Sequence, residues 1–108
     1  MAAPLSEPEF RLAADAALED LERSLLALAD QHDFDVEQQN GVLQIIFEEP
    51  AAATFVVSPN APVRQMWLSA MARGYKLSWS AESAVFALDG ETLRDMTTRL
   101  VREFLGEP

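Results

Sequence analysis

The stretch "DFDVEQQNGVLQIIF", residues 33–47, decides the fold of this chain. Apolar residues alternate with acidic or polar ones on both sides of the Asn-Gly at 40–41, and a period of two is typical of strands with one buried face. Asn-Gly supplies the positive φ angles that a two-residue hairpin turn needs. The stretch therefore predicts an antiparallel hairpin, with Asp33, Asp35 and Glu37 facing water.

Helical patterns precede and follow the region of this hairpin. Apolar residues recur every three or four positions from Glu9 to Asp30, which predicts an amphipathic helix. A similar stripe follows Asp89, which we expect to be the N-cap of a second helix that ends at Gly106. Short apolar segments between the helices predict strands at 34–37, 42–49, 54–57, 65–70, 73–79 and 84–88.

The turns between these strands are too short for parallel crossovers, so neighbouring strands are expected to be antiparallel. "SPNAP", residues 58–62, is expected to be a rigid turn, because a central strand would not tolerate its prolines. Two helices with one apolar face each can cover one side of the sheet. The sequence therefore predicts the α+β class: a two-layer α-β sandwich with two terminal helices packed on one face of a roughly six-stranded antiparallel sheet.

The length of 108 residues fits one domain, and 49% hydrophobic residues are enough for a core. We expect a single domain over residues 1–108, with residues 1–8 as a flexible N-terminal tail. The absence of cysteine excludes disulfides, thiolate metal sites and cysteine nucleophiles. There is no secretory signal pattern and no run of about 20 apolar residues, which predicts a soluble cytoplasmic protein.

The formal net charge is −10, and all of the excess lies in the first half of the chain. Residues 1–49 contain twelve acidic and two basic residues, whereas residues 50–108 contain six of each. This distribution disfavours nucleic acids and anionic membranes as partners and favours cations or a basic protein. Neither a glycine-rich phosphate loop nor a nucleophile elbow occurs, so we expect a protein that is not an enzyme.

Acidic side chains of the first helix and the first strand are the first candidate site. Their oxygens suit hard cations such as Fe³⁺ and Mg²⁺, and less specifically Fe²⁺ or Mn²⁺. A solvated, solubilising face explains the same residues without a metal. His32 has no second histidine or cysteine at ligand spacing, which disfavours it as a ligand. The candidate metal ligands are Glu19, Glu22, Asp30, Asp33, Asp35 and Glu37.

Trp67 is the second candidate. The alternation within residues 65–70 places it on the open face of the sheet if Met66 and Leu68 face the core. An exposed tryptophan is a preferred anchor of protein interfaces. The alternative is that a neighbouring loop or the C-terminal tail covers it. The other tryptophan, Trp79, is expected to belong to the core.

Four segments of the chain follow the motifs of one known family. "GVLQIIFEE" (41–49) is similar to its Gly-Val-Leu-x-Ile-x-Phe strand. "PVRQMWLS" (62–69) is similar to its Pro-x-x-Gln-hydrophobic-Trp-Leu motif. "GYKLSW" (74–79) and "GETLRDM" (90–96) resemble the start of a later strand and of its second helix. By these segments the chain resembles the frataxin family, in particular its bacterial, CyaY-type members, over residues 9–104, almost the whole chain.

The resemblance implies an α-β sandwich and a regulatory role in iron–sulfur cluster assembly. It implies that acidic residues of the first helix and strand bind Fe²⁺ or Fe³⁺ weakly, and that the chain docks on a cysteine desulfurase and an iron–sulfur scaffold protein. We expect a monomer in the absence of iron. The alternative is an acidic iron-buffering protein that acts without the assembly complex. The partner-binding residues that the resemblance implies are Trp67, Gln65, Asn60, Glu22, Asp33, Asp35 and Glu48.

Two positions depart from the family's pattern. Bacterial members usually have an adjacent acidic pair near the C-terminal end of the first helix, where this chain has Leu26 and Ala27. The turn before the tryptophan is often Asn-x-Gln, whereas this chain has Ser58-Pro59-Asn60. The first departure weakens the expectation of tight iron binding, and the second weakens that of scaffold contacts through this turn.

Overall fold

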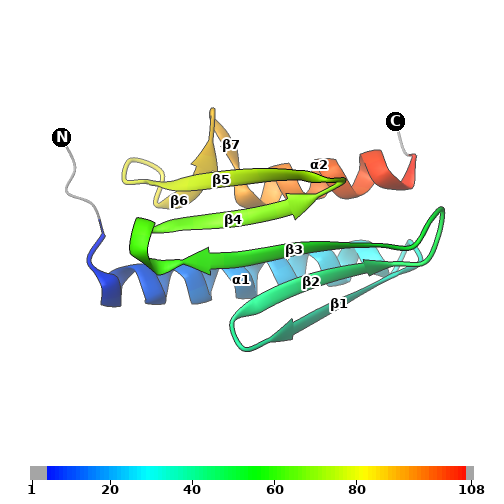
Figure 1. The fold of residues 1–108 in the computed structure, drawn as a ribbon, viewed down its shortest axis with the longest axis horizontal. Helices are drawn as coiled ribbons and strands as arrows, with labels where there is room; N and C mark the ends of the chain where they lie inside the picture. The colour runs from blue at the N-terminus through cyan, green and yellow to red at the C-terminus, as the bar shows by residue number, and fades with distance from the viewer. Residues whose placement is uncertain (1–4, 107–108) are drawn as a thin grey trace.

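The computed structural model describes residues 5–106 and confirms the predicted α+β sandwich (Figure 1). Two helices, α1 (Glu7–Ala29) and α2 (Leu93–Leu105), lie behind a single antiparallel sheet. The sheet has seven strands in sequence order, the last only two residues long, where roughly six are predicted. The strands are β1 (Phe34–Gln39), β2 (Val42–Phe47), β3 (Ala53–Asn60), β4 (Gln65–Ala70), β5 (Arg73–Ser80), β6 (Val85–Leu88) and β7 (Glu91–Thr92).

The first helix begins with a capping box. The Glu9 backbone N–H donates to the Ser6 hydroxyl at 3.2 Å, and the Ser6 backbone N–H donates to the Glu9 carboxylate at 3.0 Å. These bonds satisfy donors that have no partner within the helix. The helix therefore begins at Glu7, and the predicted flexible tail over residues 1–8 is wrong for its last residues. Residues 1–4 of that tail lie outside the described residues.

The β1–β2 hairpin confirms the turn predicted from Asn-Gly. Asn40 and Gly41 have φ angles of 55° and 76°, as a type I′ turn requires. The register places Phe34 opposite Phe47, and both rings are buried against the helices. This register puts the odd-numbered residues of β1 on the opposite, solvent-facing side of the sheet.

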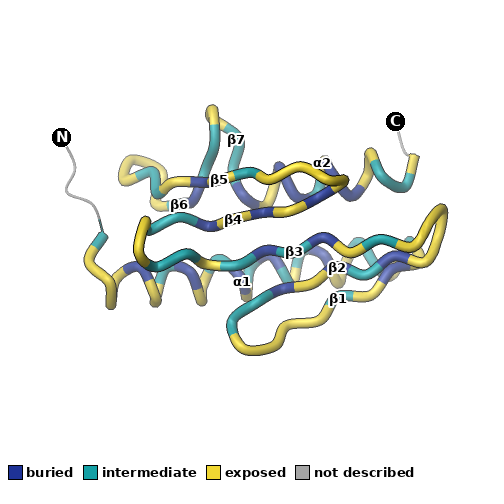
Figure 2. Tube along the Cα trace, in the orientation of Figure 1, coloured by how far each residue is buried: buried dark blue, intermediate teal, exposed yellow. Residues whose placement is uncertain are grey.

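The core lies between the helices and the inner face of the sheet (Figure 2). The Phe47 ring centre lies 4.9 Å from that of Phe55 and 4.5 Å from that of Phe104, so α2 is joined to the middle strands. Trp79 packs on this core as predicted, and its ring centre lies 5.1 Å from that of Phe86. The buried stripe of α1 consists of Phe10, Ala14, Leu18, Leu21 and Leu25.

The segment predicted as a rigid turn, residues 58–62, is partly a strand. Residues 58–60 continue β3 and pair with β4. The proline at position 59 is tolerated because pairing between β2 and β3 ends at Val57, so this end of β3 has only one neighbouring strand. The chain then turns through the short 3₁₀ helix Ala61–Val63.

The second helix begins later than predicted. Its N-cap is Thr92, whose hydroxyl accepts a hydrogen bond from the Asp95 backbone N–H at 3.1 Å. Asp89 has a φ of 52° and lies in the turn between β6 and β7. The prediction of Asp89 as N-cap is therefore wrong, because Asp-Gly is also a hairpin-turn signal. Gly106 ends the helix as predicted, with a φ of 79°.

An ion-pair network fastens α2 to the last strand. The Arg99 guanidinium donates to both Glu91 carboxylate oxygens, at 2.8 and 2.9 Å, and to Glu103 at 3.0 Å. The hydrogen bond from Arg99 holds the pKa of Glu91 below its usual value. Among the described residues, no helix has the length and apolar character needed to cross a membrane.

Thr97 is fully buried, and its hydroxyl has no hydrogen-bond partner among residues 5–106. Valine has nearly the same shape without the unsatisfied oxygen, so Thr97→Val is expected to raise the free energy of unfolding by about 1 kcal/mol. Urea unfolding followed by circular dichroism measures the change. Thr97→Ser, which keeps the hydroxyl and removes a methyl group, is the control and should be less stable than the original chain. A Thr97→Val variant that is no more stable would contradict the expectation.

Candidate functional site: the open sheet face and its acidic margin

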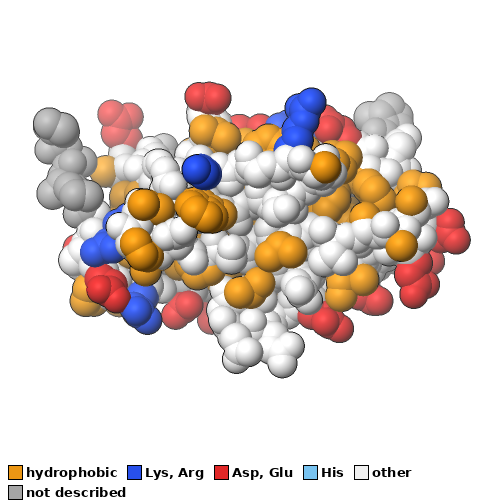
Figure 3. Space-filling model, viewed as in Figure 1, with side chains coloured by type: hydrophobic (Ala, Val, Ile, Leu, Met, Phe, Trp, Pro, Cys, Tyr) orange, Lys and Arg blue, Asp and Glu red, His pale blue; other side chains and the backbone are white. Residues whose placement is uncertain are grey.

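The face of the sheet turned away from the helices is open to solvent (Figure 3). Its middle consists mainly of uncharged polar and apolar side chains, and acidic side chains lie around its margin. The register places Ser58, Trp67 and Lys76 in one row across β3, β4 and β5. Asn60, Gln65 and Ser78 form the next row across the same three strands. Two rows from three neighbouring strands therefore meet around the tryptophan.

Trp67 lies on this face as predicted, and 37% of its surface is exposed. Its indole Nε1 donates to Gln65 Oε1 at 3.1 Å, and Gln65 Nε2 donates to Ser78 Oγ at 3.4 Å. The Lys76 ammonium lies 5.2 Å from the centre of the indole ring, within the range of a cation–π interaction. These contacts orient the indole while leaving it accessible to a partner.

The other two partner-binding residues predicted near the sheet take different positions. Asn60 is half-buried and lies opposite Gln65 at the end of the β3–β4 ladder, so it belongs to the surface around Trp67. Glu48 is exposed immediately after β2, close to the edge of the sheet formed by β1. The predicted partner residues therefore fall into two groups: Asn60 and Gln65 lie around Trp67, whereas Glu48 lies near the edge of the sheet.

The predicted acidic residues spread over α1, the following turn, β1 and the position immediately after β2. We call them the acidic band; all are exposed except Glu22, which is half-buried. Asp35 lies opposite Ile46 and Glu37 opposite Gln44, both on the open face. Among the described residues, no three histidine, cysteine, aspartate or glutamate side chains are placed to hold a metal ion together. The members of the acidic band are Glu19, Glu22, Asp30, Asp33, Asp35, Glu37 and Glu48.

Two apolar residues interrupt the negative charge of the acidic band. Leu26 and Ala27 are both exposed on α1, and 47% of the surface of Leu26 is open to solvent. They lie between Glu22 and Asp30 along the helix. The carboxylates at the C-terminal end of the helix are therefore separated, which agrees with a surface that is negative without being a compact ligand set.

A shallow hollow lies at one end of the acidic band. His32, Asp33 and Glu49 line it together with Pro50 and Leu105, and its volume is about 320 Å³. His32 is half-buried in the turn between α1 and β1. The three titratable side chains do not form a metal-binding group. The hollow therefore adds a histidine and a carboxylate to the surface but no chelating centre.

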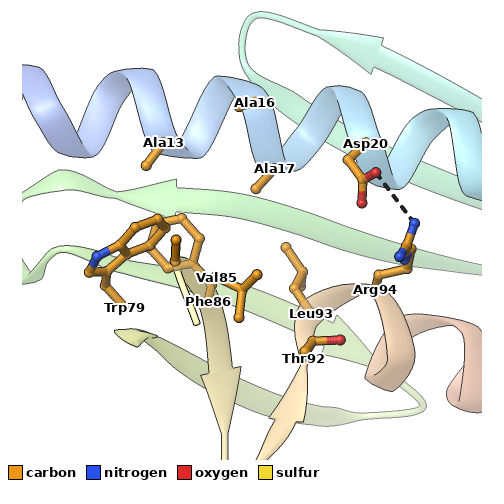
Figure 4. Close-up of a pocket in the computed structure, with 11 residues that line it drawn as sticks. Ala13, Ala16, Ala17, Asp20, Trp79, Val85, Phe86, Thr92, Leu93 and Arg94 are labelled. Carbon is orange, nitrogen blue, oxygen red and sulfur yellow. Dashed lines mark hydrogen bonds and ion pairs between the residues drawn. The ribbon is translucent and has the colours of Figure 1, made fainter. Parts of the chain in front are cut away.

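A deeper groove of about 400 Å³ lies on the helix side, between α1 and the segment from β6 to α2 (Figure 4). Alanine side chains of α1 form one wall, and Trp79 and Phe86 lie across from them. The Arg94 guanidinium and the Asp20 carboxylate, 3.4 Å apart, lie at one end. None of the predicted site residues lines the groove. The sequence signal for it is the group of alanines at positions 13, 16 and 17.

Two terminal helices on one face of an antiparallel sheet, with the other face open, are the architecture of frataxin-type α-β sandwiches. The structure superposes on yeast frataxin with a TM-score of 0.70 and 27% identity, covering 94% of this chain and 85% of the other. It superposes on a frataxin from Psychromonas ingrahamii with a TM-score of 0.72 and 17% identity, covering 95% and 94%; this likeness concerns the fold alone.

Sequence comparison identifies the family. A family model described as "Frataxin-like domain" matches residues 3–107, so the chain belongs to the frataxin-like family, as a bacterial CyaY-type member. It is 33% identical over 106 residues to "Iron-sulfur cluster assembly protein CyaY" of Pseudomonas fluorescens (strain Pf0-1), covering 94% of this chain and 91% of that protein. It is 30% identical over 106 residues to the protein of the same name from Janthinobacterium sp. (strain Marseille), covering 96% and 94%.

The exposure of Trp67 predicts that this residue contributes less to stability than Trp79 does. We expect Trp67→Ala to lower the free energy of unfolding by about 1 kcal/mol, and Trp79→Ala, which removes a ring packed against the core cluster, by about 3 kcal/mol. Urea unfolding of the two variants beside the original chain measures both values. Equal losses would show that Trp67 contributes as much to stability as Trp79 does, and would weaken the reason to place an interface here.

Proposed function

We propose that this chain is a non-catalytic accessory protein that regulates iron–sulfur cluster assembly by docking on a cysteine desulfurase and an iron–sulfur scaffold protein. Its membership in the frataxin-like family supports a role in cluster assembly, and so does the name "iron-sulfur cluster assembly protein" that its relatives carry. The observation that carries the docking proposal is the accessible Trp67, oriented by Gln65 and Lys76 on an uncovered sheet face.

The contacts of Trp67 suit it to be an interface anchor. Tryptophans that enter a partner's pocket commonly dominate the binding energy of an interface. A side chain that is already held in one orientation loses less conformational freedom on binding. Gln65 and Lys76 hold the indole in this way before any partner arrives. The scaffold protein is therefore proposed to bind the surface around Trp67.

The acidic band is proposed to bind the desulfurase. Long-range attraction between the band and a basic surface speeds encounter, and salt weakens it over a Debye length of about 8 Å at physiological ionic strength. Steering of this kind requires only net negative charge near the contact, which the separated carboxylates of the band provide. Iron is proposed to bind the same carboxylates weakly and in rapid exchange, because no chelating group is formed by the described residues.

Docking is tested by capturing purified desulfurase and scaffold protein on the immobilised chain at low and high salt. Trp67→Ala is expected to weaken scaffold capture by about tenfold or more, as loss of an interface anchor does. Asp35→Lys is expected to weaken desulfurase capture at low salt and to reduce its salt dependence.

The matched control for the charge change is Glu82→Lys. Glu82 is exposed in the turn between β5 and β6, far along the sheet from β1, and the substitution changes the net charge by the same amount. This variant should retain most of the desulfurase capture. If the original chain captures neither protein at low salt, or if both lysine variants behave alike, the docking proposal is wrong.

Iron binding is tested by adding Fe²⁺ in anoxic buffer while recording amide NMR signals. Weak binding predicts that signals of residues 19–37 broaden only at iron concentrations near the millimolar range. Asp35→Asn with Glu37→Gln should raise the required concentration further, because two carboxylates are lost. Broadening at micromolar iron would instead support the alternative function, an iron-buffering protein that acts without the assembly complex.

A further inference from the structure

The strand β1 forms one edge of the sheet: β2 pairs with one side of it, and no strand of residues 5–106 lies on its other side (Figure 1). An edge strand has a row of backbone N–H and C=O groups without partners. Gln39 and Val42 flank the two-residue turn and, by the geometry of such hairpins, exchange both backbone hydrogen bonds. Pairing alternates from there, so the backbone groups of Phe34, Val36 and Gln38 point away from β2.

The edge of β1 is accessible and regular. Four of the six residues are exposed, Val36 is half-buried, and only Phe34 is buried (Figure 2). Even Gln38, whose side chain lies on the helix side of the sheet opposite Leu43, is exposed. The strand has no proline, and its pairing with β2 is continuous over all six residues, without a bulge. Its charged side chains are thus its only feature that opposes pairing with another strand.

The charges of this edge have one sign and one orientation. Asp33, Asp35 and Glu37 are spaced two residues apart, and the last two project onto the open face of the sheet. None of the three forms an ion pair with another of residues 5–106. Like charges directly opposite each other destabilise a pair of strands, whereas opposite charges stabilise it. A second copy of β1 would therefore be repelled from this edge, and a strand with basic residues in alternation would be attracted.

We propose that β1 accepts an extended basic segment of a partner protein as an additional antiparallel strand, with lysine or arginine at every second residue. This inference rests on the proposed docking function and specifies how the acidic band binds a basic partner. The bases would lie beside Asp35 and Glu37 on the open face, and a third would reach Asp33. The residues between them would turn to the helix side beside Val36, where a β-branched apolar side chain fits. Backbone hydrogen bonds give such complexes their affinity, and alternate side chains give their specificity.

The test uses the capped hexapeptide Lys-Val-Lys-Val-Lys-Val as the probe and Lys-Lys-Lys-Val-Val-Val, of equal composition and charge, as the control. Amide hydrogen exchange of the chain is followed by NMR with each peptide. The alternating peptide is expected to slow exchange of the Val36 and Gln38 amides severalfold, because these N–H groups point to the open edge. The Asp35 and Glu37 amides already face β2 and should change little.

A backbone substitution separates strand addition from simple charge attraction. Gln38→Pro removes one outward-pointing N–H at an exposed position and leaves the bonds between β1 and β2 in place. This substitution is expected to weaken binding of the alternating peptide by about two- to tenfold, which is the loss expected for one hydrogen bond. Gln38→Ala keeps the N–H and should bind as the original chain does. Circular dichroism and urea unfolding of both variants verify that the chain remains folded.

Three outcomes would overturn the proposal. Equal binding of the two peptides, with no slowing at Val36 and Gln38, would mean that charge attraction alone is at work. Equal peptide binding by folded Gln38→Pro and Gln38→Ala would show that the backbone edge is not used. Slowing at these amides that increases with protein concentration in the absence of peptide would identify a second copy as the occupant.

Failure of this inference is distinguishable from failure of the proposed function. If the desulfurase is captured equally by the Gln38→Pro and Gln38→Ala variants, the added strand is wrong while docking stands. If the unmodified chain captures neither the desulfurase nor the scaffold, the proposed function fails, whatever the peptides do. The peptide experiments use neither the desulfurase nor the scaffold, so their result does not depend on the proposed function.

Discussion

The Phe47 ring joins the two layers of the molecule, because it contacts Phe55 on the neighbouring strand and Phe104 on α2. Both helices bury their apolar stripes against this inner face of the sheet. A sheet with one buried face has a fixed register, since a slip of one residue would turn every apolar side chain of a strand to water. Packing on one face thereby determines which side chains the other face presents.

The outward position of Trp67 follows directly from this constraint. Its sequence neighbours Met66 and Leu68 are almost fully buried, so the residue between them must face solvent. The outward positions of Asp35 and Glu37 have the same cause, with Val36 between them on the helix side. The surface around Trp67 and the part of the acidic band on β1 therefore both depend on the packing of one core, and a change in register would destroy both.

The elements that strong local signals specify were the ones predictable from sequence. Asn40-Gly41 and the period of two are enough to predict the first hairpin, because turn type and pairing register are linked. Pro59 misled the prediction because its tolerance depends on how far β2 extends, which its own neighbours in the chain do not reveal. Asp89 misled it because the same dipeptide serves as a helix start and as a hairpin turn.

The candidate site, too, is predictable from sequence only where local signals are enough. The phase of β4 predicts that Trp67 is exposed, but its contacts with Ser78 through Gln65 and with Lys76 depend on the register between β4 and β5. The groove beside Trp79 depends on how far α1 lies from β6 and from the start of α2, and alanines in a helical stripe are equally typical of a close helix contact. Residue type and spacing predict which side chains are outward, and tertiary pairing decides which of them meet.

The acidic band illustrates how different demands on charge favour one function over another. Chelation of a hard cation requires several oxygens to converge within about 2.0–2.6 Å of one point, which needs a folded loop or a cleft. Attraction of a basic protein requires only that negative charge accumulate within roughly a Debye length of the contact. The exposed Leu26 between Glu22 and Asp30 obstructs the first arrangement, yet it adds apolar area that a protein partner can cover. A leucine at this position therefore disfavours a chelating metal site and suits a protein interface.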